Sequence, residues 1–334
     1  MPMETGPRTI VWDTTYACPL QCVHCYSESG RRASRQLGPE TMLEVAEKIV
    51  EAGPGTVILS GGEPLLVPGI VDVGRRLARA GIRTAVYTGG WSIRPELAEQ
   101  LASTFTMVAV SVDGATAEVH DKVRGRQGSF DRAMRSLAVL DEVAERTPFT
   151  FGIDCSFMRG NFHELDDICR TVVPRFPRLG FAYFGPAVPC GVASRPAFAA
   201  ELLTDAQVRE LSGEDRLARL RSLAGAGIDV QTSDNRHLLM HPSQATDWST
   251  HNTAQIEPDG NVRAMCIYEG TIGNILTDPP SVLWERSLAR WHDPFVVETL
   301  GAVRTMADWS VATRRMDQRF GTPEDHRRIA LRPD

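Results

Sequence analysis

The sequence predicts an α/β fold: an open, partial parallel (β/α)6 barrel followed by a small C-terminal α+β cap. From residue 8 to about residue 185, short apolar runs alternate with longer helical patterns. Such strand–helix alternation is typical of a parallel sheet with right-handed crossovers. From about residue 228 the pattern changes to short segments around a turn, followed by a helix. The six repeats suit an open barrel better than a closed eight-fold one.

Six segments have the pattern of strands: Thr9–Thr14, Thr56–Ser60, Thr84–Thr88, Met107–Val112, Phe149–Phe157 and Gly180–Phe184. Helical patterns lie between them, near 40–52, 69–80, 95–103, 130–145 and 163–173. Pro39 and Pro95 each precede a glutamate and begin a first helical turn. Gly53 and Gly81 follow the ends of two helices, the position where glycine commonly ends a helix. The carboxyl ends of these strands are expected to meet at one mouth of the barrel, where such folds place their sites.

The remainder of the chain predicts a closing helix and a cap. A helix near 204–224 begins after Thr204 and closes the barrel. Gln255–Glu257 and Asn261–Met265 flank Pro258-Asp259-Gly260, which indicates a β-hairpin. The expected division is a core at 8–227, a cap at 228–320 and a tail at 321–334.

Composition narrows the classes of function. The chain has 334 residues with 42% hydrophobic and 23% charged side chains, as in an ordinary globular protein. Its net charge is −6 and it has no basic tract, which argues against nucleic acid as a partner. No apolar run approaches the ~18 residues that span a membrane, and the first residues do not resemble a signal peptide. Seven cysteines, an odd number, favour free thiols and a cytoplasmic location.

Three of those cysteines form the most informative motif, Cys18-x3-Cys22-x2-Cys25. Four thiolates normally close a [4Fe–4S] cluster, so three would leave one iron open to a ligand that is not protein. A structural zinc site prefers four ligands in two pairs, and no second CxxC is present. His24 lies between two of the cysteines and would complete a tetrahedron only with strain. Zinc or chance is therefore the weaker interpretation.

The run from Thr14 to Tyr26 resembles the cluster loop of radical S-adenosylmethionine (radical SAM) enzymes, with His24 at a position that is usually aromatic. The resemblance implies one [4Fe–4S] cluster, with SAM bound to the open iron and His24 and Tyr26 beside the cofactors. It implies that one electron cleaves SAM to methionine and a 5′-deoxyadenosyl radical, which removes a hydrogen atom from the substrate. An electron donor such as flavodoxin or ferredoxin is the implied partner. The partial barrel is also the core fold of that family.

The segment after the second expected strand, Gly61-Gly62-Glu63-Pro64, resembles the GGEP motif of the same family. In the family, the backbone and the glutamate of this motif bind the methionine amine. Glycine lets a backbone approach a ligand closely, and a carboxylate pairs with an ammonium group. By itself the segment would be only a turn signal.

Further SAM contacts are implied at the ends of later strands. Ser111 and Asp113 match positions that hydrogen-bond the ribose or methionine part of SAM, although Asp-Gly is also an ordinary turn. Arg124 matches an arginine that contacts the SAM carboxylate, a role that suits a guanidinium; the alternative is a solvated loop arginine. Thr88 begins the equivalent of a Thr-Asn-Gly run, in which Gly89 replaces the asparagine.

The segments 256–266 and 273–275 resemble a SPASM or twitch domain, which carries an auxiliary [4Fe–4S] cluster in relatives. Cys266 matches the ligand that leaves the hairpin, but the preceding segment 248–252 contains no cysteine. Either Cys190, Cys266 and a third group hold an auxiliary cluster, or the domain has lost it and Cys266 is a free thiol facing the site. The second interpretation is favoured because four thiolates are the norm. Cys169 is expected in the core.

A free Cys266 thiol could return a hydrogen atom to a substrate radical from the opposite face, as radical SAM epimerases of the aminoglycoside and peptide types are thought to do. The alternative is a buried relic. The first functional hypothesis is therefore epimerisation of a small polar natural product of the aminoglycoside, sugar or nucleoside type. The short lead before the first strand is expected to leave no room for a leader-binding domain. Asp154, Tyr183 and Phe184 are the expected substrate contacts.

Three other hypotheses stay open. One is dehydrogenation, dehydration or decarboxylation of a sugar or nucleoside, without a thiol donor. Another is modification of a ribosomal peptide whose leader binds a separate partner. A non-enzymatic cluster-binding module is disfavoured, because the cysteine triad, the Gly-Gly-Glu segment and Ser111 are all intact.

Overall fold

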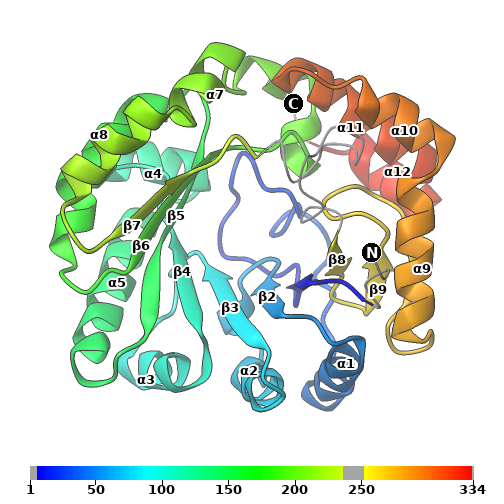
Figure 1. Ribbon diagram of the computed structural model, residues 1–334, viewed down its shortest axis with the longest axis horizontal. Coiled ribbons are helices and arrows are strands. Elements are labelled where there is room, and N and C mark those ends of the chain that lie inside the picture. The colour runs from blue at the N-terminus through cyan, green and yellow to red at the C-terminus, as the bar shows by residue number, and fades with distance from the viewer. Residues whose placement is uncertain (1–5, 236–251, 333–334) are drawn as a thin grey trace.

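The computed structural model describes residues 6–235 and 252–332, and its strands form one curved ten-stranded sheet (Figure 1). The strand order is β10-β9-β8-β1-β2-β3-β4-β5-β6-β7. Strands β1 to β7 run parallel in chain order, which confirms the expected open barrel. The strands are β1 (Thr9–Asp13), β2 (Thr56–Ser60), β3 (Arg83–Thr88), β4 (Met107–Ser111), β5 (Thr150–Phe157), β6 (Phe181–Pro186), β7 (Asp229–Thr232), β8 (Thr253–Ile256), β9 (Asn261–Arg263) and β10 (Thr271–Asn274).

Four strands extend the sheet beyond the six barrel strands that the sequence predicts. Strand β7 pairs with β6 in parallel, so residues 229–232 lie in the barrel sheet. Strand β8 pairs in parallel with the other side of β1, and β9 and β10 continue from it antiparallel. Strand β7 has a single buried side chain, Val230, and therefore lacks the apolar alternation that marks a strand in sequence. The division into core, cap and tail stays a prediction.

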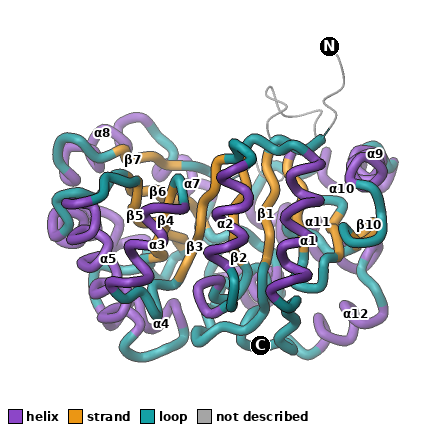
Figure 2. The backbone as a smooth tube through the Cα atoms, turned by 90° about the horizontal axis from the view of Figure 1, so that it is seen from below, coloured by secondary structure: helices purple, strands orange, loops and turns teal. Residues whose placement is uncertain are grey.

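Helices cover the convex side of the sheet, and Figure 2 shows α1 and α2 side by side outside β1 and β2. Their bounds are α1 (Pro39–Ala52), α2 (Ile70–Arg79), α3 (Pro95–Thr104), α4 (Ala117–Arg124), α5 (Ser129–Arg146), α6 (Leu165–Asp167), α7 (Asp205–Leu211), α8 (Glu214–Ala224), α9 (Pro280–Trp291), α10 (Pro294–Gly301), α11 (Met306–Phe320) and α12 (Pro323–Ala330). Helix α6 continues as a π-helical stretch, Ile168–Val172. No helix in the described ranges has the length and apolarity to cross a membrane.

The helix boundaries follow local signals, with one exception. Gly53 ends α1 at φ +68°, where only glycine is free of strain. Thr204 begins α7 and forms a reciprocal capping box with Gln207. The single helix expected over 204–224 is wrong, because the structure has two, α7 and α8, separated at Ser212 and Gly213. Glycine is a poor helix former, and Gly213 adopts an extended conformation as the N-cap of α8.

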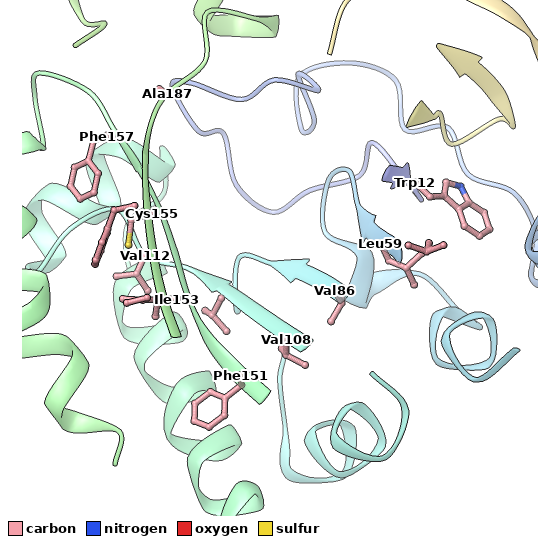
Figure 3. Close-up of a cluster of buried hydrophobic side chains, with 14 of the residues drawn as sticks. Trp12, Leu59, Val86, Val108, Val112, Phe151, Ile153, Cys155, Phe157 and Ala187 are labelled. Carbon is pink, nitrogen blue, oxygen red and sulfur yellow. The ribbon is translucent and has the colours of Figure 1, made fainter. Parts of the chain in front are cut away.

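Alternation along the strands separates the hydrophobic core from the interior of the barrel. On β2, Val57 and Leu59 are fully buried in the core cluster, whereas Ile58 and Ser60 line the barrel cavity. Figure 3 shows Leu59, Val86 and Val108 among the side chains of this core. The core therefore lies between sheet and helices, which leaves the concave side of the sheet free to build a site.

The last described segment is attached to the cluster loop, here residues 14–38, between β1 and α1. Arg332 forms an ion pair of 2.7 Å with Glu28, and Arg328 contacts the same carboxylate. Glu28 is 4% exposed and adopts φ +57°. The segment expected as a tail thus contains helix α12, and Arg328 in this helix and Arg332 just after it neutralise a buried acid of the cluster loop.

Candidate active site

The cluster loop crosses the concave side of the sheet and brings its three cysteines to one cavity. Cys18, Cys22 and Cys25 all line this cavity of about 750 Å³. Two backbone hydrogen bonds attach the loop to the end of α4, from Gln21 N to the Arg124 carbonyl at 3.1 Å and from Val23 N to the Val123 carbonyl at 3.0 Å. The folding of the loop therefore brings all three cysteines to the same cavity.

Each of the three sulfur atoms has a polar neighbour. Leu20 N–H donates to Cys18 Sγ at 3.4 Å, and Arg124 Nη1 donates to Cys22 Sγ at 3.7 Å. Ser27 Oγ lies 3.5 Å from Cys25 Sγ. Hydrogen bonds to the sulfur atoms are among the features that set the properties of an iron–sulfur cluster. Within the described ranges, no three His, Cys, Asp or Glu side chains converge on a single metal ion, and thiolates of a cluster each bind a different iron.

The segment that follows β2 packs against the cluster loop through its backbone. Gly62 N donates to the Thr15 carbonyl at 2.7 Å, and Glu63 N donates to the Ala17 carbonyl at 2.9 Å. A Cβ on Gly62 would stand 2.2 Å from the Ala17 oxygen. Gly61 and Gly62 line the cavity. Glycine is thus required here for close approach of two backbones, in addition to the ligand role predicted for it.

The Glu63 carboxylate is fully buried and has three donors in the protein. Thr88 Oγ1 donates to it at 2.7 Å, Gly89 N at 2.9 Å and Leu65 N at 3.2 Å. Burial raises the pKa of Glu63, and these donors lower it in part. Pro64 opens a short 3₁₀ turn after it. Glu63 therefore links β2 to the end of β3, while its contact with the SAM amine stays a prediction.

Asp113 is fully buried after β4 and forms the centre of a charged cluster. Its Oδ2 lies 2.7 Å from Arg124 Nε and 3.1 Å from His24 Nε2, and Ser156 N donates to Oδ1 at 2.8 Å. Burial raises the pKa of this carboxyl, but the Arg124 guanidinium and His24 together hold it well below its usual range. Arg124 is not a solvated loop residue. It is 8% exposed, lines the cavity and is fixed between Asp113 and Cys22.

The expected substrate contacts lie in one row across neighbouring strands. Ser111 on β4 pairs with Asp154 on β5, which pairs with Tyr183 on β6, and all three line the cavity with Phe184. Burial, reinforced by the nearby Asp113 charge, raises the pKa of Asp154 to about 7. This face of the cavity therefore offers an acid that changes charge near neutrality, beside a phenol and a hydroxyl.

Cys266 follows β9 and lines the same cavity as the cluster cysteines. Burial raises the pKa of its thiol to about 12, and the Asp13 carboxylate adds to this effect. Cys155 also lines the cavity, whereas Cys190 and Cys169 are fully buried. The expected core position of Cys169 is confirmed. Most of the segment 248–252, in which the sequence lacks a cysteine, lies outside the described residues.

Sequence reasoning missed several residues that connect the cap to the cluster loop. Tyr16 OH donates to Glu257 at 2.6 Å, and Glu257 forms a 3.0 Å ion pair with Arg263. Asp13 accepts from Gln255 Nε2 at 2.7 Å. The one sequence feature that could have identified Asp13 is its place as an acidic residue at the end of a strand that is expected to be buried. No local pattern could have paired it with a residue 242 positions away.

Comparisons with known proteins agree with this geometry. Residues 12–154 match the sequence model of the Radical SAM superfamily. The chain is 34% identical over 165 residues to an AdoMet-dependent heme synthase of Methanosarcina barkeri, which covers 49% of this chain and 46% of that protein. It is 38% identical over 136 residues to the mycofactocin maturase MftC of Mycobacterium tuberculosis, which covers 40% of this chain and 34% of that protein. The matches thus span less than half of each relative.

Solved structures share the fold at low sequence identity. SuiB of Streptococcus suis, bound to its precursor peptide SuiA, matches with a TM-score of 0.67 and 14% identity over 90% of this chain and 68% of that one. The protein anSMEcpe with bound AdoMet matches with a TM-score of 0.61 and 17% identity, over 84% of this chain and 81% of that one. These likenesses confirm the partial-barrel fold and extend over most of this chain.

A parallel barrel whose first loop presents three cysteines to a cavity is the framework of an enzyme that works with an iron–sulfur cluster. By their match to the sequence model, residues 12–154 carry a radical SAM domain. The family implies a [4Fe–4S] cluster and SAM, and the residues present fit both. The three cysteines line one cavity, each beside a polar group, and Gly61 and Gly62 line the same cavity. The roles of the individual residues toward these groups stay predictions.

Proposed function

We propose that this enzyme epimerises one carbon of a small polar natural product, of the aminoglycoside, sugar or nucleoside type, with Cys266 as the hydrogen donor. One observation carries the proposal: the Cys266 thiol lines the same cavity as the three cysteines of the cluster loop. A hydrogen donor must reach the substrate within the space that holds the radical source. Cys266 follows β9 and the three cluster-loop cysteines follow β1, so two separate segments of the chain contribute thiols to the space for a substrate.

The proposed roles are as follows. Cys18, Cys22 and Cys25 would hold a [4Fe–4S] cluster, which together with SAM would supply the radical that removes a hydrogen atom from a substrate carbon. Cys266 then gives up its S–H hydrogen atom to the opposite face of that carbon, forming the inverted C–H bond. The sulfur radical left on Cys266 returns to the thiol with one electron and one proton. A flavodoxin- or ferredoxin-type donor supplies both electrons consumed in each cycle.

The surroundings of Cys266 support this role. A hydrogen-atom donor has to be a neutral thiol, and burial that raises the pKa of Cys266 to about 12 keeps it protonated near neutrality. Cys190 is fully buried and does not border the cavity. These observations favour a free thiol over an auxiliary cluster ligand, and free thiols favour the reducing cytoplasm.

The cavity supports a small and polar substrate. Its volume of about 750 Å³ has to hold SAM together with the substrate. Polar side chains line it on β5, β6 and β7, namely Asp154, Tyr183 and Gln231, and Asn235 follows β7. An acid with a pKa near 7 suits an amine or a sugar hydroxyl as its partner.

The decisive experiment compares wild type with Cys266→Ala and Cys190→Ala after anaerobic reconstitution. Cys266→Ala is expected to retain about four irons per chain and to form 5′-deoxyadenosine, but to yield no epimer. In D₂O, the wild-type product should carry one deuterium at the inverted carbon, because a thiol exchanges its proton with solvent. Cys190→Ala should behave like wild type. If Cys266→Ala forms the epimer at the normal rate, Cys266 is not the hydrogen donor. About eight irons per chain in wild type would indicate a second cluster and would favour dehydrogenation, dehydration or decarboxylation instead.

A second candidate is modification of a ribosomal peptide. The observation that favours it is the 38% identity to a mycofactocin maturase. A leader peptide would then bind a separate partner protein. The discriminating measurement is formation of 5′-deoxyadenosine above background with small glycosides or nucleosides and with candidate precursor peptides. Stimulation by peptides alone would replace the small-molecule proposal.

A further inference from the structure

The residue next to Cys266 has an unusual backbone. Ile267 adopts φ +68°, in the left-handed region that β-branched side chains rarely occupy. Such a conformation persists only where its surroundings enforce it. Something other than the local sequence must therefore hold the backbone that directs Cys266 into the cavity.

A chain of buried hydrogen bonds provides that hold. Ile267 N donates to Gln255 Oε1 at 2.7 Å, and Gln255 Nε2 donates to Asp13 Oδ2 at 2.7 Å. Tyr26 OH donates to the other oxygen of Asp13 at 2.5 Å and lies 3.1 Å from Ser60 Oγ. The Ile267 N–H needs an acceptor and the Asp13 carboxylate needs a donor. These two partners therefore fix which end of the Gln255 amide faces each of them.

The chain of bonds joins the two halves of the proposed site. Gln255 is 0% exposed and Asp13 is 1% exposed, so no water competes for these bonds. Asp13 ends β1, Tyr26 directly follows the cluster cysteine Cys25, and Gln255 belongs to β8. The backbone beside Cys266 is thereby attached to the loop that carries the cluster.

We propose that Gln255 is a positioning residue, which holds the Ile267 backbone in its left-handed conformation and so fixes the Cys266 thiol relative to the cluster loop through Asp13 and Tyr26. This inference rests on the proposed function of Cys266 as hydrogen donor. Gln255 itself does not border the cavity. It acts through the backbone next to the donor.

The test uses Gln255→Met, which keeps the length of the side chain and removes both hydrogen bonds, in the reconstituted holoenzyme. The first measurement is the rate at which iodoacetamide alkylates Cys266, followed by peptide mass spectrometry, with iron per chain measured in parallel. Gln255→Met is expected to accelerate alkylation about tenfold, the effect of losing roughly one buried hydrogen bond, with iron unchanged. Gln100→Met, on the exposed face of α3, is the matched control. An unchanged rate in Gln255→Met overturns the inference.

A second pair of variants keeps the test decisive if Gln255→Met alone does not fold. Asparagine adopts the left-handed region more readily than isoleucine, so Ile267→Asn needs less support from Gln255. Adding Gln255→Met to Ile267→Asn is expected to change the alkylation rate by less than about threefold. A tenfold acceleration in this background would overturn the link between Gln255 and the Ile267 backbone.

Turnover provides the readout that a merely structural role would not move. With the thiol displaced, the substrate radical persists longer and can instead take one electron from the donor protein and one proton, which restores the starting substrate after one SAM has been consumed. Gln255→Met should therefore form more 5′-deoxyadenosine per epimer, and an unchanged ratio counts against the inference. The alkylation rate needs no substrate. It therefore judges Gln255 even if Cys266→Ala shows that Cys266 is not the donor.

Discussion

The close approach of Gly62 to the cluster loop makes Gly62→Ala a sharp test of how the site is built. A Cβ at this position would stand 2.2 Å from the Ala17 oxygen and 2.8 Å from the Ala17 carbon, both backbone atoms. Backbone cannot rotate away as the end of a side chain can. The two segments must therefore separate, and Ala17 immediately precedes Cys18, a predicted cluster ligand.

The size of the effect follows from these distances. Ordinary contact begins near 3.4 Å, so the Ala17 oxygen has to move by about 1.2 Å. Overpacking of this kind costs about 1–3 kcal/mol. The movement also breaks the 2.9 Å hydrogen bond from Glu63 N to the same oxygen, which adds about 1 kcal/mol. We expect Gly62→Ala to lower the free energy of unfolding by about 2–4 kcal/mol.

The assay is anaerobic thermal unfolding of the apo form, together with iron and labile sulfide per chain after reconstitution. Gly62→Ala should lower Tm by several degrees and reduce the bound iron, because Cys18 moves with Ala17. Gly38→Ala is the matched control. It precedes α1 at φ −69°, and a Cβ there meets no atom within 4 Å. A Gly62→Ala protein with wild-type Tm and a full cluster would show that the backbone contact has been misjudged.

Two further predictions concern buried charges. Burial and the nearby Asp113 charge raise the pKa of Asp154 from 3.8 to about 7, so the folded state binds this proton more tightly than the unfolded state and wild-type stability declines as pH rises from about 4 to 7. In urea unfolding, Asp154→Asn should therefore be more stable than wild type by about 2 kcal/mol at pH 8 and by almost nothing at pH 4. An equal difference at both pH values would contradict the raised pKa. Arg263 is 2% exposed and forms ion pairs with Glu257 at 3.0 Å and Glu269 at 3.1 Å, so Arg263→Met should lower the free energy of unfolding in urea by about 3–5 kcal/mol. Arg35, whose ion pair is more exposed, is the control, and Arg35→Met should cost at most about 1 kcal/mol. Similar losses in the two variants would argue against a buried network around Arg263.

The elements that the sequence predicts well are those with local signals. The six parallel strands, the Pro39 and Pro95 helix starts and the Thr204 cap agree with the structure to within about two residues. The cysteine triad could be read directly, because its spacing alone indicates a cluster with an open iron.

The elements that escaped prediction depend on partners distant in the chain. Strand β8 is short, and only its pairing with β1 makes it part of the barrel sheet. Arg124 could be matched to a family position, but its fixation by Asp113 required the fold to bring the two together. Gln255 is an unremarkable residue in sequence, and its significance lies entirely in the partners at its two ends.

The pairing of β1 with β8 also sets an order of events in biosynthesis. At roughly 5–20 residues per second, a ribosome needs on the order of ten to fifty seconds to pass from the cysteine triad to β8. Until then β1 lacks one neighbour, and Asp13 and Tyr16 lack the partners that they find 242 and 241 residues later. The cluster loop thus reaches its native surroundings only after most of the chain has been made. Cluster insertion is therefore expected to follow synthesis of the cap, and a cell that makes this protein must protect three unliganded thiols in the interval.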